Sequence, residues 1–193
     1  MSVIKNTSVK LFGSARKHFS FSFDQLNDWE IGIVHQMIRS TRHKRILNLN
    51  LLINHLGNGW MYPILALAII GWYGLDSWPV IAISALSAAI AHILYPKIKN
   101  HLKRDRPHEF DPELVIPVKP LDQYSCPSGH CMTLVAVSIP LWSMFPEIGP
   151  VIFFWWLAMA WSRLSLGHHY LSDVLLGSMI GALVGIPNTW LLS

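Results

Sequence analysis

Charged residues are scarce in this chain. Asp, Glu, Lys and Arg make up 13% of its 193 residues, where a soluble domain typically carries roughly 25%. Hydrophobic residues make up 52%, and a chain this short has little interior in which to bury them. A soluble helical domain is therefore a strained interpretation of the composition. A membrane protein is favoured, and nine Trp and five Tyr add the aromatics that gather at membrane–water interfaces.

Cysteine is also rare, with only Cys126 and Cys131 present. Two cysteines are too few for a disulfide scaffold, and they lack the spacing of a zinc site. We interpret them as small buried residues, with a local disulfide as the less favoured alternative. We expect no cleavable signal peptide, because residues 1–28 are polar and contain no apolar stretch of the required length.

Positive charge is unevenly distributed, although the formal net charge is only +4. The basic residues lie in the N-terminal third and in one loop, with apolar segments between them. A nucleic-acid-binding protein would usually show a continuous basic stripe or a repeated motif. Attraction to anionic lipid head groups is the better explanation, so we expect the bilayer and no nucleic acid as a partner.

Five apolar segments follow residue 58, at 60–75, 78–95, 128–145, 148–161 and 171–192. A membrane-spanning helix needs roughly 20 residues, which the second, third and fifth segments approach. The first reaches this length if residues 53–59 extend it, and the fourth is short unless 162–166 belong to it. The short links at 76–77 and 146–147 predict antiparallel helix hairpins, whereas 97–127 is predicted to be a long polar loop.

The N-terminal region differs from the rest of the chain. Between Asp24 and Arg39, apolar residues recur at helical spacing among polar ones. This pattern predicts an amphipathic helix in the membrane interface or packed on the protein, which are not exclusive. We therefore predict an all-α polytopic membrane helix bundle with about five spanning helices, six being possible. Residues 1–58 form a basic and amphipathic interfacial region, and 59–193 form the transmembrane core.

Three polar clusters interrupt the apolar pattern, at residues 99–107, 126–130 and 162–173. The two predicted hairpins place all three at the same membrane face. Lys99, Arg106 and Arg163 bring three cations together, which suits a multiply charged phosphate. Ser128 and Gly129 lie at a predicted helix start, where free backbone N–H groups bind anions.

Two histidines add reactive groups to this cationic region. His169 and Asp173 are four residues apart at a helix start and share one face. A carboxylate bonded to one ring nitrogen leaves the other nitrogen free to attack. His130 belongs to a different helix and can protonate a leaving oxygen. No metal or other cofactor is needed for this chemistry, and no metal ligand set is apparent.

Each of these residues also has a simpler interpretation. Basic residues at the end of a spanning helix usually extend toward the head groups or set the topology, and we favour this for Lys97, Lys103 and Arg104. A lone His is more often structural, and a Ser-Gly pair can be a helix cap. The three clusters together favour a site for phosphoryl transfer.

The three clusters resemble the signature of the type 2 phosphatidic acid phosphatase superfamily, which includes bacterial acid phosphatases and vanadium haloperoxidases. That signature is Lys, six residues and Arg-Pro; Pro-Ser-Gly-His; and Ser-Arg, five residues, His, three residues and Asp. Every specified position matches: Lys99 with Arg106-Pro107, Pro127-Ser128-Gly129-His130, and Ser162-Arg163 with His169 and Asp173. The match falls within roughly residues 59–192.

The resemblance implies a role for each matching residue. His169 becomes a phosphohistidine, Asp173 supports it, and His130 protonates the leaving group. The phosphoryl oxygens are bound by Lys99, Arg106, Ser128, Gly129 and Arg163. His168 is out of register and receives no role.

We therefore expect a membrane phosphatase acting on a lipid phosphate or diphosphate. Polyprenyl diphosphates such as undecaprenyl diphosphate, phosphatidic acid and phosphatidylglycerophosphate all fit, and the oligomeric state is open. A lipid-to-lipid phosphotransferase would use the same intermediate. A vanadium haloperoxidase is disfavoured because those proteins are generally soluble and larger. A non-enzymatic lipid-binding protein would be expected to lack His169 or His130.

The membrane face of the site is predicted from the distribution of positive charge. With five spans, all 15 Lys and Arg residues fall on the motif side. Positive charge in short loops marks the cytoplasmic face, so we predict a multi-pass protein of the cell (inner) membrane with a cytoplasmic site. The resemblance implies the opposite, because membrane members of the superfamily generally act on the extracytoplasmic face.

Overall fold

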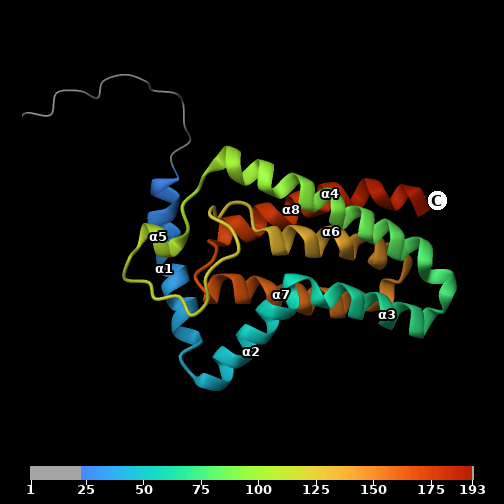
Figure 1. The fold of residues 1–193 in the computed structure, drawn as a ribbon, viewed down its shortest axis with the longest axis horizontal. Coiled ribbons are helices and arrows are strands. Elements are labelled where there is room, and N and C mark those ends of the chain that lie inside the picture. The colour runs from blue at the N-terminus through green and yellow to red at the C-terminus, as the bar shows by residue number, and fades with distance from the viewer. Residues whose placement is uncertain (1–22, 193) are drawn as a thin grey trace, which may run out of the picture.

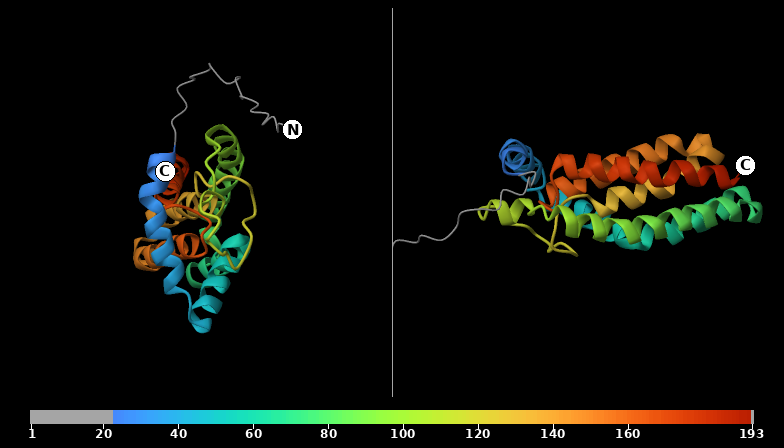
Figure 2. Two further views of the ribbon diagram at one scale, coloured as in Figure 1. Left: turned by 90° about the vertical axis from the view of Figure 1, so that its left-hand side faces the viewer. Right: turned by 90° about the horizontal axis from the view of Figure 1, so that it is seen from above.

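The computed structural model describes residues 23–192, and every regular element within this range is a helix. Helices pack side by side into an elongated bundle, while α1 (Asp24–Ser40) crosses one end of it (Figures 1 and 2). The bundle consists of α3 (Met61–Tyr73), α4 (Trp78–Leu102), α6 (Gly129–Met144), α7 (Gly149–Ser165) and α8 (Leu171–Thr189). The predicted all-α architecture is confirmed.

Both predicted helix hairpins are present. A short 3-10 turn, Leu75–Ser77, joins α3 to α4, and a second, Pro146–Ile148, joins α6 to α7. Gly74 ends α3 with φ of 83°, a conformation that glycine adopts without the steric cost of a side chain. Both turns and the C-terminal end lie at the end of the bundle opposite α1 (Figure 1).

The closest helix packing is between α6 and α8, where glycines spaced four residues apart face the other backbone. A Cβ atom on Gly181 would lie 2.3 Å from the carbonyl oxygen of Met132, and one on Gly177 would lie 2.5 Å from that of Ser128. Stripes of small residues let helices approach closely in membranes, where lipid provides no hydrophobic driving force between them. This contact fixes the register of α6 against α8.

The segment predicted as a loop from residue 97 begins later than expected. Helix α4 continues to Leu102. The apolar pattern stops near Tyr95, but the helix continues through the polar residues that follow. Lys99 therefore lies on the last turn of α4. Lys103 ends the helix with φ of 50°, and a short helix, α5 (Pro107–Phe110), lies within the remaining loop.

The N-terminal region contains the predicted helix and one that was not predicted. The buried face of α1 carries Asn27, Glu30 and Val34, whereas Trp29 is 69% exposed. Sequence periodicity indicated an amphipathic helix, and its inward side carries the apolar Val34, Ile31 and Ile38 together with two buried polar residues, Asn27 and Glu30. Helix α2 (Lys44–His55) follows, and a kink at Leu56–Trp60 leads directly into α3.

Two described helical stretches are long and apolar enough to cross a membrane, by length and composition. These are Leu75–Phe110 and Leu171–Leu192, and Gly129–Met144 is a shorter apolar helix. Large apolar side chains also cover the outside of the bundle, including Trp72, Leu67, Phe154 and Leu183. This surface agrees with a membrane protein, and five spans remain our prediction.

Replacing Gly181 with Ala should destabilise the fold. The added Cβ would overlap the Met132 carbonyl and force α6 and α8 apart, and overpacking of this kind costs roughly 1–3 kcal/mol. Thermal unfolding of the purified protein in detergent measures the effect. Gly71→Ala is the matched control, because its Cβ would meet nothing within 4 Å, and Ala favours helix. Equal stability of the two variants would contradict the close packing.

Candidate active site

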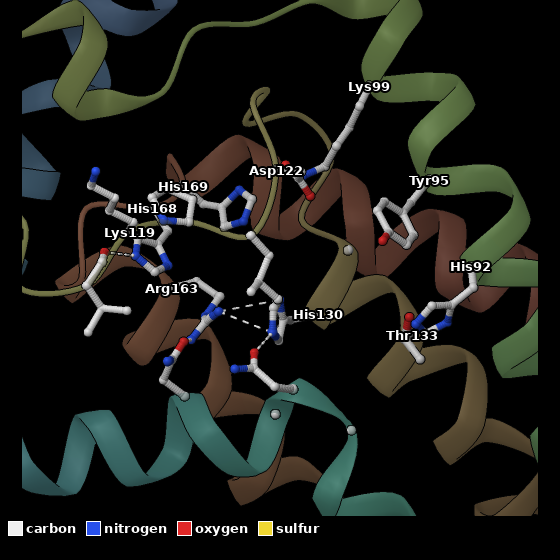
Figure 3. Close-up of a pocket in the computed structure, with 18 of the residues that line it drawn as sticks. His92, Tyr95, Lys99, Lys119, Asp122, His130, Thr133, Arg163, His168 and His169 are labelled. Atoms are coloured by element: carbon white, nitrogen blue, oxygen red, sulfur yellow. Dashed lines mark hydrogen bonds and ion pairs between the residues drawn. The ribbon is translucent and has the colours of Figure 1, made fainter.

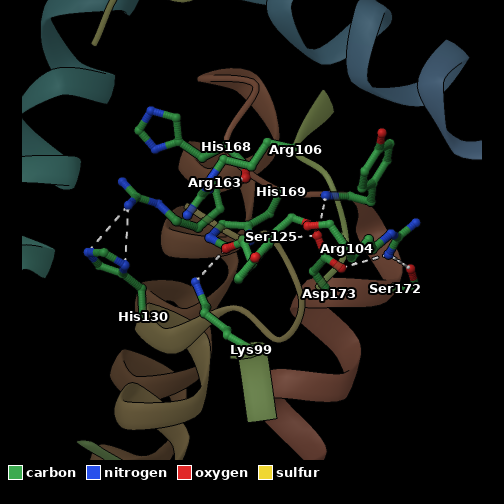
Figure 4. A network of polar contacts seen from close by, with 12 residues as sticks. Lys99, Arg104, Arg106, Ser125, His130, Arg163, His168, His169, Ser172 and Asp173 are labelled. Carbon is green, nitrogen blue, oxygen red and sulfur yellow. Dashed lines mark hydrogen bonds and ion pairs between the residues drawn. The ribbon is translucent and has the colours of Figure 1, made fainter. Parts of the chain in front are cut away.

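The end of the bundle crossed by α1 brings together residues from all three motifs (Figures 3 and 4). A cavity of about 190 Å³ opens there. Among the motif residues, those that line it are Lys99, Arg106, Gly129, His130, Arg163 and His169. Ser128 and Asp173 are fully buried beside it. The site residues predicted from sequence therefore converge on one place.

Lys99 and Arg106 are held by a carboxylate that the sequence analysis did not single out. The Oδ1 atom of Asp122 accepts hydrogen bonds from Lys99 Nζ at 2.7 Å and from an Arg106 terminal nitrogen at 2.6 Å. Lys99 also donates to the Tyr124 carbonyl at 2.9 Å. Asp122 lines the cavity, so an anion already lies where both cations point.

Arg163 approaches the cavity from the last turn of α7. One terminal nitrogen donates to Asn54 Oδ1, and the other lies 3.3 Å and 3.4 Å from the two ring nitrogens of His130. His130 Nε2 lies 2.9 Å from Asn58 Oδ1. Asn54 and Asn58 come from α2 and the kink after it, a region that the motifs do not include. No spacing signal marks them, because they reach the site only through packing.

His169 and Asp173 lie close together, but His169 precedes α8 and only Asp173 is on its first turn. Asp173 Oδ2 is 3.6 Å from His169 Nδ1, too long for a hydrogen bond, and it accepts the Tyr170 N–H at 2.9 Å. Burial lowers the pKa of His169 well below its ordinary value, and the nearby cations Arg106, Lys99 and Arg163 add to this. The ring is therefore neutral at physiological pH, which nucleophilic attack requires.

The central motif is fixed against Asp173 by the backbone. Ser128 N–H donates to the Asp173 carbonyl at 3.0 Å, so the start of α6 is tied to the first turn of α8. The first-turn N–H groups of a helix have no partner within it and can bind an anion. A Cβ on Gly129 would lie 3.3 Å from the Tyr95 ring, so glycine keeps this helix start close to α4.

His168, to which the motif gives no role, anchors the polar loop. Its Nε2 lies 2.8 Å from the Val118 carbonyl, and its own carbonyl accepts a hydrogen bond from Arg106. Burial lowers the pKa of His168 to about 4. The side chain is thus a neutral structural group at the edge of the cavity.

The interpretation of Arg104 as a residue extending toward head groups is wrong. Its side chain is only 1% exposed. It bonds to Asp173 and Ser172 (Figure 4), and also to Glu30 and Asn27. Hydropathy cannot separate it from Lys103 next to it, because a buried pairing depends on residues far along the chain.

The two cysteines are buried as expected, and both are free, so the local disulfide is absent.

The pattern of the PAP2 superfamily matches residues 77–192. The chain belongs to this superfamily. The family that the three motifs predicted is therefore confirmed, and with it the assignment to the phosphatases, a class of hydrolases.

Two relatives illustrate the similarity. Over 140 residues, the chain is 32% identical to decaprenylphosphoryl-5-phosphoribose phosphatase of Mycobacterium tuberculosis (strain ATCC 25618 / H37Rv), covering 69% of this chain and 73% of that protein. Over 80 residues, it is 31% identical to lipid A 1-diphosphate synthase of Escherichia coli (strain K12), covering 41% and 33% respectively.

Solved structures show the same fold. The PAP2 type phosphatidylglycerolphosphate phosphatase from Bacillus subtilis aligns with a TM-score of 0.66 at 19% identity, covering 87% of this chain and 86% of that one. Aquifex aeolicus LpxE aligns with a TM-score of 0.68 at 20% identity, covering 83% and 94%. At these identities the likeness concerns the fold.

The low pKa of His168 predicts loss of stability in acid. Its pKa is about 4 in the folded protein and about 6.5 when unfolded. Its contribution is therefore fully present above pH 6.5 and is lost as pH falls toward 4, by at most roughly 3 kcal/mol. His168→Gln keeps a donor for Val118 and should flatten the fall in melting temperature between pH 7 and 5. The exposed His101→Gln is the control, and identical pH profiles would contradict this account.

Proposed function

We propose that this protein is a membrane phosphatase that removes the terminal phosphate of a lipid phosphate or diphosphate through a phosphohistidine at His169. The observation that carries the proposal is one cavity containing a neutral histidine, a second histidine and three cations, with a carboxylate behind the first. The lipid phosphates named in the relatives support a substrate of this class, among them polyprenyl phosphates. Residues 59–193 would form the transmembrane phosphatase core and 1–58 an interfacial region; of these, residues 1–22 and 193 lie outside the described part of the chain.

Substrate binding would exchange one anion for another. The phosphoryl oxygens bind Lys99, Arg106, Arg163 and the first-turn amides of α6, around Ser128 and Gly129. Because Asp122 occupies Lys99 and Arg106 in the free protein, its carboxylate must withdraw when phosphate enters. A phosphate with two negative charges can replace it, since charge-assisted hydrogen bonds to a dianion are stronger.

Phosphoryl transfer would then follow in two steps. His130 takes up a proton when the anionic substrate binds beside it, because a nearby negative charge favours the protonated ring. The Nε2 atom of His169 then attacks phosphorus, a P–N bond forms, and the bond to the lipid oxygen breaks as His130 gives that oxygen this proton. Asp173 stabilises the positive charge that develops on the His169 ring. In the second step a water molecule attacks phosphorus, neutral His130 takes its proton, and inorganic phosphate leaves His169. The three cations stabilise the transition-state charge.

A groove beside the cavity supports a lipid substrate. It has a volume of about 310 Å³, and its walls are apolar side chains of α3, α4 and α6, such as Leu65, Ile81 and Val137. Tyr62 and His92 line both the groove and the cavity. A lipid chain placed in this groove would therefore lead its phosphate toward His169.

A lipid-to-lipid phosphotransferase is the second candidate. It is favoured by the similarity to a protein named lipid A 1-diphosphate synthase. The chemistry differs only in the second step, where a lipid phosphate oxygen would attack phosphorus in place of water. Appearance of a second phosphorylated lipid during turnover distinguishes this activity from hydrolysis.

His169→Ala should abolish turnover, with a loss of roughly 10⁴-fold or more because the covalent path is closed. His130→Ala should slow the reaction least with p-nitrophenyl phosphate, whose leaving group needs little protonation. Phosphate release from a panel of lipid phosphates in detergent measures both effects, with the exposed His101→Ala as control.

Activity should also survive EDTA and be blocked by vanadate. Near-normal turnover by His169→Ala, or a requirement for magnesium, would contradict the mechanism.

We further propose that the protein is a multi-pass protein of the cell (inner) membrane whose site faces the cytoplasm. The short turns at the far end of the bundle contain Asp76 and Glu147 but neither Lys nor Arg, whereas Arg42 lies in the turn between α1 and α2 and Lys44 begins α2. Positive charge in short loops favours the cytoplasmic side. In this topology the site and the C-terminal end lie on opposite sides of the membrane, so an odd number of spans must separate them.

Cysteine labelling in intact cells should therefore leave the site end unmodified. Glu113 is exposed in the loop beside α5, so Glu113→Cys in a chain lacking Cys126 and Cys131 reports on this face. A membrane-impermeant thiol reagent should label it only after the cells are opened. Asp76→Cys in the opposite turn is the control that should be labelled at once, and the reverse pattern would place the site outside the cytoplasm.

A further inference from the structure

A buried ionic cluster joins α1 to the catalytic end of α8, and Figure 4 shows its members Arg104, Ser172 and Asp173. At its centre is the guanidinium of Arg104. One terminal nitrogen donates to Asp173 Oδ1 and to Ser172 Oγ, both at 2.6 Å, and the other donates to Glu30 Oε2 at 2.7 Å. Its Nε donates to Asn27 Oδ1 at 2.9 Å. We call these five residues the Glu30 cluster.

The charges of this cluster are removed from water. Glu30, Arg104 and Asp173 are each no more than 1% exposed, and the guanidinium stacks 4.0 Å from the Tyr170 ring centroid. A buried charge that loses its partner is strongly destabilising, so the three groups must remain paired. Two carboxylates and one guanidinium leave the cluster with one net negative charge.

The geometry links Glu30 to His169 through two intermediates. Arg104 binds Oδ1 of Asp173, which leaves Oδ2 turned toward the His169 ring at 3.6 Å. Glu30 binds the opposite edge of Arg104, and its Oε1 accepts the backbone N–H of Ser172 at 2.7 Å. Glu30 therefore holds both Arg104 and the first turn of α8, the turn that carries Asp173.

We propose that Glu30 is a positioning residue for phosphoryl transfer, acting through Arg104 to orient Asp173 and to leave its negative charge available to His169. The inference rests on the proposed function of His169 as the nucleophile. It gives α1 a part in the reaction, although α1 lies outside the three motifs.

The physical reason is a balance of charge. If Arg104 were paired only with Asp173, the two charges would cancel and His169 would face no net negative charge as it becomes positive. Glu30 supplies the second carboxylate that Arg104 needs, so one negative charge remains beside Nδ1. This charge opposes the cations on the other side of His169. The charged and titratable groups facing His169 are Lys99, Arg106, His130, Arg163, His168 and Asp173, and Asp122 lines the same cavity.

The variants Glu30→Gln, Arg104→Gln and their combination test the proposal. Glu30→Gln should lower kcat roughly 10–100-fold with little change in KM, as for other residues that orient a reactive group indirectly. In Glu30→Gln one negative charge near His169 is lost, so the protonated His169 ring is less stable. The acidic limb of the kcat/KM profile, which reports protonation of His169, should therefore move to lower pH. Arg104→Gln removes a positive charge and should move it to higher pH. The double variant restores one net negative charge and should return the limb toward its original position.

Asp28→Asn is the matched control, because Asp28 is an exposed carboxylate on the same helix. Rates are normalised to folded protein, measured as the monodisperse fraction in size-exclusion chromatography. If Arg104→Gln fails to fold, Arg104→Lys replaces it and should keep the wild-type limb while lowering kcat. A Glu30→Gln protein with the kcat and pH profile of Asp28→Asn would overturn the inference, as would a loss of folded protein with an unchanged profile.

Failure of the proposed function would look different. An inactive wild-type protein, or an active His169→Ala variant, would refute the phosphohistidine mechanism itself. An active wild type with an inactive His169→Ala variant, combined with an unaffected Glu30→Gln variant, would leave the proposed function intact. That result would reduce Glu30 to a structural contact.

Discussion

The contact between α6 and α8 is the constraint on which the site depends. Gly177 and Gly181 allow the two backbones to meet, and the Ser128 N–H bonds to the Asp173 carbonyl where they meet near the cavity. The helix start proposed to bind phosphate and the carboxylate behind His169 are thereby placed in one register. Small side chains on one helix thus determine distances between polar groups on two helices. Other elements of the site, including α4, α7 and α1, are added around this pair.

The sequence was most informative where chemistry is tied to a helix end. The motif residues lie in the last turns of α4 and α7, in the first turns of α6 and α8, or a few residues beyond these helix ends, as Arg106 and His169 do. Short hairpins bring these ends together. Their convergence could therefore be predicted from segment lengths and turns. The end of α4 was placed too early, because hydropathy reports where a helix leaves the apolar region and not where the helix stops.

The supporting residues could not be found from the sequence in the same way. Asn54, Asn58 and Asp122 reach the cavity only through tertiary packing, and no local spacing distinguishes them from other polar residues. Arg104 and Glu30 are 74 residues apart, and their pairing explains both the burial of Arg104 and the burial of a carboxylate on α1. Helical periodicity predicts that α1 forms. It does not predict that Glu30 pairs with Arg104, because that contact depends on the packing of the whole fold.

Asp122 has a consequence for the end of the catalytic cycle. A cradle of buried cations with no anion of its own would hold inorganic phosphate tightly, and such a product would leave slowly. Because Asp122 can return to Lys99 and Arg106, the cost of vacating the cradle is offset by an ion pair within the protein. The net affinity for phosphate is then set by the difference between two binding free energies at the same cations, that of free phosphate and that of the tethered Asp122 carboxylate. A tethered competitor favours turnover over product retention, and its effect does not depend on the concentration of any ion in solution.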